Sequence, residues 1–147
     1  MDGTKELVLV VEYEPLVRMF AVDFVEENAG CDVVEAADAD HAVAILEART
    51  DIRILLTDVD MLGSVDGMKL AQAVRDRWPP IEIIILSGHK RRVDDELPTL
   101  AVLLPKPYDV DAVTAELHRM AGLVRMQREG ATDETTSEFF TSANGDR

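Results

Sequence analysis

The sequence is poor in the features that define several classes of protein. Its 147 residues include one cysteine, Cys31, which excludes an internal disulfide, and no Cys/His spacing typical of a zinc site. No apolar run approaches the ~20 residues of a membrane span. Residues 1–5 lack the pattern of a signal peptide, so a cytoplasmic protein is expected. Basic residues are also scarce: 15 Lys and Arg face 29 Asp and Glu, and the net charge of −14 argues against nucleic acid or a membrane surface as the partner.

The chain does contain a regular alternation of two kinds of segment. Five short apolar segments have the composition of buried strands, and the segments between them carry apolar residues at helical spacing. The expected strands cover residues 7–11, 31–36, 52–57, 81–86 and 101–104. Right-handed crossovers between them predict an α/β fold with a doubly wound five-stranded parallel sheet. Of the common strand orders of such sheets, the one expected here is 2-1-3-4-5, the flavodoxin-like arrangement.

Local signals place the helices between these strands. Pro15 stands where a first helical turn accepts proline, and residues 16–25 follow with apolar side chains at helical spacing. Asp38 or Asp40 is expected to cap the second helix, and Asp66 to open the third. A last helix is expected from about residue 109.

Two regions depart from this pattern. The slot of the fourth helix, residues 89–98, has little apolar content and predicts one or two irregular turns. After the last helix the composition turns polar, with only Phe139 and Phe140 to bury. We therefore expect a single domain over residues 1–124 and a disordered polar C-terminal tail over residues 125–147.

The residues that carry chemistry stand at the ends of the predicted strands: Glu12, Asp58, Ser87 and Lys106. In the expected sheet these ends meet along one edge. Two carboxylates there can hold a hard divalent cation, and a carboxylate can also accept a phosphoryl group. A hydroxyl and an ammonium opposite would neutralise the phosphoryl oxygens. Each residue alone has a simpler explanation, such as a helix cap for Asp58, and the ordered set is far more specific.

These motifs identify a family resemblance. From about Leu7 to Ala121 the chain resembles a response-regulator receiver domain of bacterial two-component signalling. The residues that carry the resemblance are Val-Val-Glu-Tyr-Glu-Pro-Leu-Val-Arg (10–18), Leu-Leu-Thr-Asp-Val-Asp-Met (55–61), Asp66-Gly67, Ile-Leu-Ser-Gly (85–88) and Pro-Lys-Pro-Tyr (105–108).

The resemblance implies a role for each matching residue. Asp58 corresponds to the phosphoacceptor, Ser87 to the hydroxyl switch residue and Lys106 to the phosphate-sensing lysine. The implied cofactor is Mg²⁺, held by Glu12, Asp58 and the backbone carbonyl of Asp60. The implied partners are a histidine kinase or histidine phosphotransfer protein and a downstream protein target. A stand-alone regulator without enzymatic activity is expected, and whether two copies form a homodimer is left open.

Three positions differ from the family pattern. Tyr13 stands where a second acidic residue normally binds Mg²⁺ directly, and a neutral phenol is a poor ligand for a hard cation. Leu62 replaces a proline in the loop after the phosphoacceptor, and Leu103 replaces the aromatic switch residue. The expected Mg²⁺ binding is therefore weak.

The sequence leaves three functions open. The first is phosphoryl acceptance and relay by the receiver. The second is a pseudo-receiver, a binding module of the same fold that works without phosphorylation, which Tyr13 and Leu103 favour. The third is a phosphatase that uses Asp58 as nucleophile and Asp60 as acid/base, but nothing in the sequence supplies a cap domain or a substrate pocket.

Overall fold

The computed structural model describes residues 5–59, 66–88, 97–107 and 109–137. Strands and helices alternate through most of the chain. In chain order the elements are β1 (Leu7–Val11), α1 (Pro15–Glu27), β2 (Asp32–Ala36), α2 (Ala39–Ala48), β3 (Ile52–Asp58), α3 (Gly67–Arg77), β4 (Glu82–Ser87), β5 (Val102–Pro105) and α4 (Val110–Ser137).

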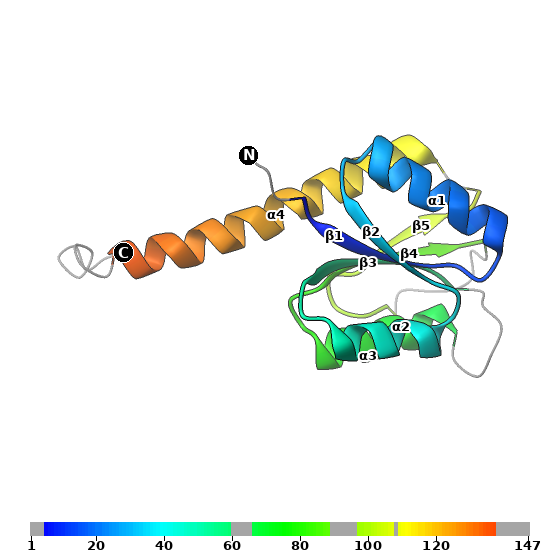
Figure 1. The fold of residues 1–147 in the computed structure, drawn as a ribbon, viewed down its shortest axis with the longest axis horizontal. Coiled ribbons are helices and arrows are strands. Elements are labelled where there is room, and N and C mark those ends of the chain that lie inside the picture. The colour runs from blue at the N-terminus through cyan, green and yellow to red at the C-terminus, as the bar shows by residue number, and fades with distance from the viewer. Residues whose placement is uncertain (1–4, 60–65, 89–96, 108, 138–147) are drawn as a thin grey trace.

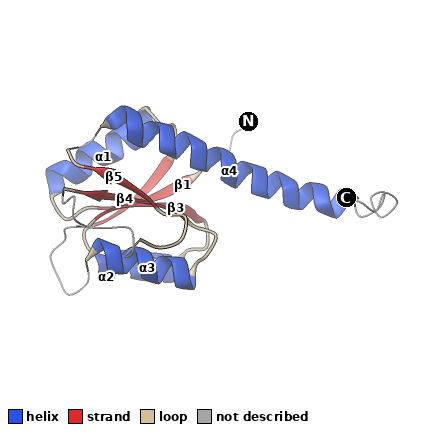
Figure 2. Cartoon of the chain, turned by 180° about the vertical axis from the view of Figure 1, so that it is seen from behind, coloured by secondary structure: helices blue, strands red, loops and turns tan. Residues whose placement is uncertain are grey.

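The five strands form one parallel sheet in the order β2-β1-β3-β4-β5, which confirms the predicted fold class and topology. Helices α1 and α4 cover one face of the sheet, and α2 and α3 cover the other (Figure 1). The view from behind shows the same three layers (Figure 2). Because both faces are covered, the central strands are buried on both sides, which explains their continuous apolar composition.

The sheet divides the hydrophobic core into two clusters. Alternate residues of a strand point to opposite faces, so Leu9 and Val11 belong to the cluster with α2 and α3. Val8 and Val10 belong to the cluster that includes residues of α1 and α4. All four side chains are at most 1% exposed.

Side-chain caps fix the beginnings of two helices. Asp38 caps α2 by accepting a hydrogen bond from the His41 N–H at 2.8 Å, which decides between the two predicted caps. Asp66 caps α3 in the same way through the Lys69 N–H at 2.9 Å. Each cap satisfies a backbone donor that the first helical turn leaves without an intrahelical partner.

Two helices show features that periodicity did not predict. In α1 the apolar side chains of Leu16, Met19 and Phe20 are 77%, 59% and 47% exposed, so only part of its apolar surface meets the sheet. Helix α4 continues past residue 124 to Ser137 and projects beyond the sheet (Figure 1). The division at residue 124 into domain and tail stays a prediction.

Two of the expected segments lie partly outside the residues that the structure describes. Most of the segment 89–98, residues 89–96, lies outside them, as do residues 138–147 of the polar tail. None of the helices in the described part of the chain is both long and apolar enough to span a membrane.

Candidate functional site

The carboxyl edge of the sheet collects the four residues singled out from the sequence. Asp58 and Ser87 are the last residues of β3 and β4, while Glu12 and Lys106 directly follow β1 and β5. The register pairs Asp58 with Leu86 and Ser87 with Pro105, so the strand ends lie at one level. Glu12, Asp58 and Ser87 are all at most 5% exposed.

Asp58 and Lys106 form an ion pair at this edge. The Lys106 Nζ lies 3.1 Å from the Asp58 Oδ2, and the Lys106 side chain remains 28% exposed. The Lys106 N–H also donates to the Ser87 carbonyl at 2.9 Å, which ties the chain after β5 to the end of β4. A carboxylate taken out of water in this way needs its partner, because an uncompensated buried charge is costly.

Glu12 is the second buried acid beside Asp58. Burial raises the pKa of the Glu12 carboxyl, and the charge of Asp58 and a hydrogen bond shared with Asp58 raise it further. The Glu14 N–H, which donates to the Glu12 Oε2 at 3.2 Å, and the nearby Lys106 ammonium act in the opposite direction. Two carboxylates so close repel each other, and a cation between them would relieve that repulsion.

Arg18 of α1 holds the backbone at Glu12 in place. Its NH1 donates to the Glu12 carbonyl at 2.8 Å, and its Nε pairs with the Glu35 Oε1 on β2 at 3.1 Å. The arginine therefore connects the end of β1 with β2 and with the helix that follows. Sequence reasoning had assigned no role to Arg18.

Gly67 allows the start of α3 to lie directly on the end of β3. Its N–H donates to the Val59 carbonyl at 2.9 Å. A Cβ at this position would collide with the Asp58 carbonyl oxygen and come within 2.7 Å of the Asp58 carbonyl carbon. This role was missed from the sequence, although a glycine directly after a capping aspartate is a signal for such a close approach.

The predicted metal ligands are only partly within the described structure. Glu12 and Asp58 come together as expected, whereas Asp60 lies outside the described residues. Across the described ranges, no three His, Cys, Asp or Glu side chains form a metal-binding group. Tyr13, beside Glu12, is half-buried. Two adjacent carboxylates are oxygen donors of the kind that Mg²⁺ prefers, so the pair itself fits a divalent cation.

The structure describes both positions of the expected switch, Ser87 and Leu103. Ser87 is buried at the end of β4, one residue beyond the partner of Asp58. Leu103 packs partly buried against the cluster on the α2 and α3 side of the sheet. Leu62 and Tyr108 lie outside the described residues.

An exposed apolar patch, formed by Leu16, Met19 and Phe20, lies on the N-terminal half of α1. The helix begins three residues after Glu12, so the patch adjoins the acidic edge. The Phe20 ring is held edge-on against Phe24, with the ring centroids 5.5 Å apart. Apolar side chains gathered in this way on a surface are typical of sites for protein contacts.

Comparison with known proteins assigns the fold to a family. The model of the response regulator receiver domain matches residues 8–118. The cyclic di-GMP phosphodiesterase RocR of Pseudomonas aeruginosa is 41% identical, over 76% of this chain and 30% of RocR. The chain spans less than a third of the length of the first curated relatives that it matches.

Solved structures agree with that assignment. The receiver domain of the hybrid histidine kinase CckA is 29% identical, covers 78% of this chain and 98% of its own, and has a TM-score of 0.65. The response regulator TrrA of Thermotoga maritima, solved in complex with Mg²⁺ and BeF, shares the fold at 20% identity and a TM-score of 0.70, over 78% of this chain and 98% of TrrA. Receiver domains are signalling modules of two-component systems that generally bind Mg²⁺ and interact with histidine kinases or phosphotransfer proteins. This chain belongs to the family of response regulator receiver domains.

Proposed function

We propose that the chain is a phosphoryl-accepting receiver, and that Asp58 takes the phosphoryl group from a phosphohistidine of a kinase or phosphotransfer protein. The observation that carries this proposal is the buried Asp58 carboxylate, held 3.1 Å from the Lys106 ammonium and beside Glu12. A carboxylate in this setting is a fixed nucleophile with a cation at hand for the incoming charge.

In the proposed reaction, an Asp58 carboxylate oxygen attacks the phosphorus of the phosphohistidine. A P–O bond forms as the P–N bond breaks, and the electron pair of the broken bond returns to the imidazole nitrogen. Lys106 then pairs with a phosphoryl oxygen instead of the carboxylate alone, and the Ser87 hydroxyl donates to another. Glu12, Asp58 and the backbone carbonyl of Asp60 would hold Mg²⁺. The ion would neutralise charge on the phosphoryl oxygens.

The exposed patch of α1 is the proposed docking surface for the phosphodonor protein. A donor histidine must reach Asp58 at the carboxyl edge, and Leu16, Met19 and Phe20 lie beside that edge. Burying such side chains in an interface contributes about 25 cal/mol per Å² of apolar area. We further propose that the receiver signals through contacts with a downstream protein.

A pseudo-receiver is the second candidate function, and Tyr13 is the observation that favours it. The position next to Glu12 offers a phenol in place of a carboxylate, so one negative charge and one oxygen ligand are lost beside the site. Weak cation binding would make phosphorylation slow. The fold would then serve as a binding module whose contacts do not depend on Asp58 chemistry.

Labelling with a small phosphodonor tests the proposal. The native chain, Asp58→Asn and the control Asp51→Asn are incubated with acetyl phosphate and Mg²⁺ and followed by intact mass. Asp51 is exposed at the opposite edge of the sheet, so its substitution is a matched loss of one carboxylate. An adduct of about 80 Da is expected on the native chain and on Asp51→Asn, and none on folded Asp58→Asn. Labelling that persists in Asp58→Asn would remove Asp58 from its role, and a native chain that never labels would favour the pseudo-receiver.

A further inference from the structure

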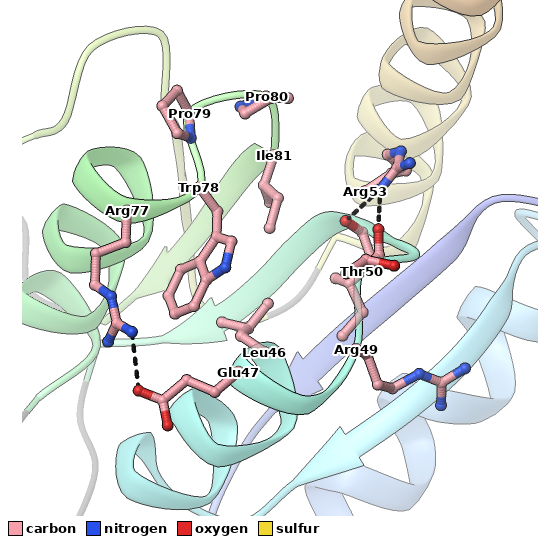
Figure 3. A pocket seen from close by; sticks show the side chains of 11 residues that line it. Leu46, Glu47, Arg49, Thr50, Arg53, Arg77, Trp78, Pro79, Pro80 and Ile81 are labelled. Atoms are coloured by element: carbon pink, nitrogen blue, oxygen red, sulfur yellow. Dashed lines mark hydrogen bonds and ion pairs between the residues drawn. The ribbon is translucent and has the colours of Figure 1, made fainter.

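A pocket of about 310 Å³ lies at the edge of the sheet opposite the phosphoacceptor. This open pocket is lined by the C-terminal ends of α2 and α3 and by the residues at the start of β3 and β4. Its interior is apolar: Leu46, Ile52 and Ile81 are at most 5% exposed, and the Trp78 indole forms one wall (Figure 3). This volume and lining are typical of small-molecule sites at the lower end of their size range.

Hydrogen bonds hold the aromatic wall in position. The backbone N–H of Trp78 donates to the Val74 carbonyl at 2.8 Å, and the backbone carbonyl of Trp78 accepts a hydrogen bond from the Ile81 N–H at 3.0 Å. Arg75 fixes the turn between them, because its NH1 donates to the carbonyls of Pro79 and Ile81, both at 2.8 Å. The pocket is therefore already formed, which lowers the conformational cost of binding a ligand.

The charges around the pocket favour an anion. Three arginines and one acid line it, in a chain whose net charge is −14. Arg77 pairs with Glu47 at 2.9 Å and stacks its guanidinium 4.4 Å from the centre of the Trp78 ring. Arg49 is likewise neutralised, by two hydrogen bonds of 2.9 Å to the Asp51 carboxylate outside the pocket.

Arg53 is the lining arginine that has no such direct pair, although its charge contributes to lowering the pKa of Asp51. Its NH1 donates to the backbone carbonyls of Thr50 at 2.8 Å and Ile52 at 3.2 Å. No carboxylate forms a hydrogen bond or ion pair with Arg53 within the described ranges. The guanidinium is thus anchored on one side, while its remaining N–H groups are available to a ligand.

We propose that this pocket binds a small aromatic carboxylate. The aromatic ring would lie against Trp78 in the apolar interior, and the carboxylate would accept hydrogen bonds from Arg53 at the rim. Guanidinium and carboxylate match in geometry as well as charge, and an aromatic ring gains both area burial and stacking on an indole. The site is separate from the phosphoacceptor, because Arg53 and Asp58 stand at opposite ends of β3, about 17 Å apart at the ordinary rise of a strand.

Binding can be measured directly with 2-naphthoate as the probe and neutral 2-naphthamide as its isostere. Trp78 is the single tryptophan of the chain, so its indole N–H gives one resonance in an NMR titration. We expect 2-naphthoate to shift this resonance in a saturable way and to bind at least about tenfold more tightly than 2-naphthamide, since a charge-assisted hydrogen bond is lost in the amide.

Variants locate the carboxylate. Arg53→Gln is expected to weaken 2-naphthoate about tenfold and to leave 2-naphthamide unchanged, while Arg53→Lys, which keeps the charge, should retain part of the affinity. The control Arg119→Gln removes an exposed arginine of α4 paired with Glu116 and should bind like the native chain. Each of three results would overturn the proposal: the Trp78 resonance does not shift at about 1 mM 2-naphthoate, 2-naphthoate and 2-naphthamide bind equally tightly, or Arg53→Gln binds 2-naphthoate with native affinity. Acetyl phosphate labelling of Arg53→Gln should stay native, so this test and that of the proposed function fail independently.

Discussion

Replacing Gly67 by alanine should damage both the stability and the chemistry of the receiver. The new Cβ would meet backbone atoms of β3, including the Val59 Cα at 2.8 Å, and backbone cannot move aside as a flexible side chain can. Overpacking of this kind typically costs about 1–3 kcal/mol. Displacement of α3 would also strain the hydrogen bond from the Gly67 N–H to the Val59 carbonyl, worth about 1 kcal/mol. The higher helix propensity of alanine offsets about 0.5–1 kcal/mol of this destabilisation. The free energy of unfolding is therefore expected to fall by about 1–3 kcal/mol.

Gly122→Ala is the matched control for this substitution. Gly122 lies inside α4, and a Cβ there meets no atom within 4 Å. The same chemical change should therefore stabilise the fold by about 0.5–1 kcal/mol. Urea unfolding followed by the emission of Trp78 gives both values from the midpoints and slopes.

The effect on chemistry comes from the atoms that Gly67 touches. Moving the backbone of Asp58 by about 1 Å misplaces the nucleophile, which can slow a positioned reaction by up to about 100-fold. Acetyl phosphate labelling of folded Gly67→Ala measures this loss. If the two glycine variants shift the unfolding midpoint in the same direction, or if Gly67→Ala labels at the native rate, the close approach of α3 to β3 does not constrain the site.

Three further outcomes follow from the site and the end of the chain. Tyr13→Asp should bind Mg²⁺ about tenfold more tightly than the native chain and accept the phosphoryl group faster, because the substitution adds an oxygen ligand and a negative charge beside Glu12. Equal Mg²⁺ affinities of the two forms would contradict this prediction. The pKa of Glu12 is raised in the folded state, so between the ordinary carboxyl pKa and the raised pKa the folded chain retains a proton that the unfolded chain has lost. The free energy of unfolding therefore falls as the pH rises through this range. Glu12→Gln should flatten that profile and be more stable at neutral pH without divalent cations; urea midpoints across pH that keep the native slope would refute the assignment. A chain that stops after Met126 should lose less than about 1 kcal/mol, because residues 127–147 lack the apolar periodicity of a packed element. A larger fall in melting temperature would show that the removed segment stabilises the domain.

The parts of this structure that follow simple periodicities were predictable from the sequence. Continuous apolar runs such as 7–11 identify strands buried on both faces, and the alternation of strands with helices leads to the observed parallel, doubly wound sheet. The strand-end positions of Glu12, Asp58 and Lys106 follow from the same register argument, because parallel strands bring their carboxyl ends to one edge.

Other features depend on contacts between segments distant in sequence. Helical spacing marks an apolar face on α1 but does not say how much of that face the sheet covers, so the exposure of Leu16 and Phe20 required the structure. The Arg18 side chain contacts both the Glu12 carbonyl after β1 and the Glu35 carboxylate on β2. The pocket beside Trp78 forms only where two helices and two strands meet. Such sites depend on tertiary geometry that no local pattern encodes.

The division of the core by the sheet has a consequence for how this protein can change. Val8 and Val10 share no packing cluster with Leu9 and Val11, although the four residues are consecutive in β1. Substitutions in the two clusters that lie more than about 10 Å apart and share no packing partner should therefore destabilise independently, so that their free-energy changes add. One helical layer can be repacked, and its outer surface refitted to a new binding partner, while the backbone of the sheet keeps Asp58 where it is. The receiver can in this way acquire a different recognition surface without rebuilding its chemistry.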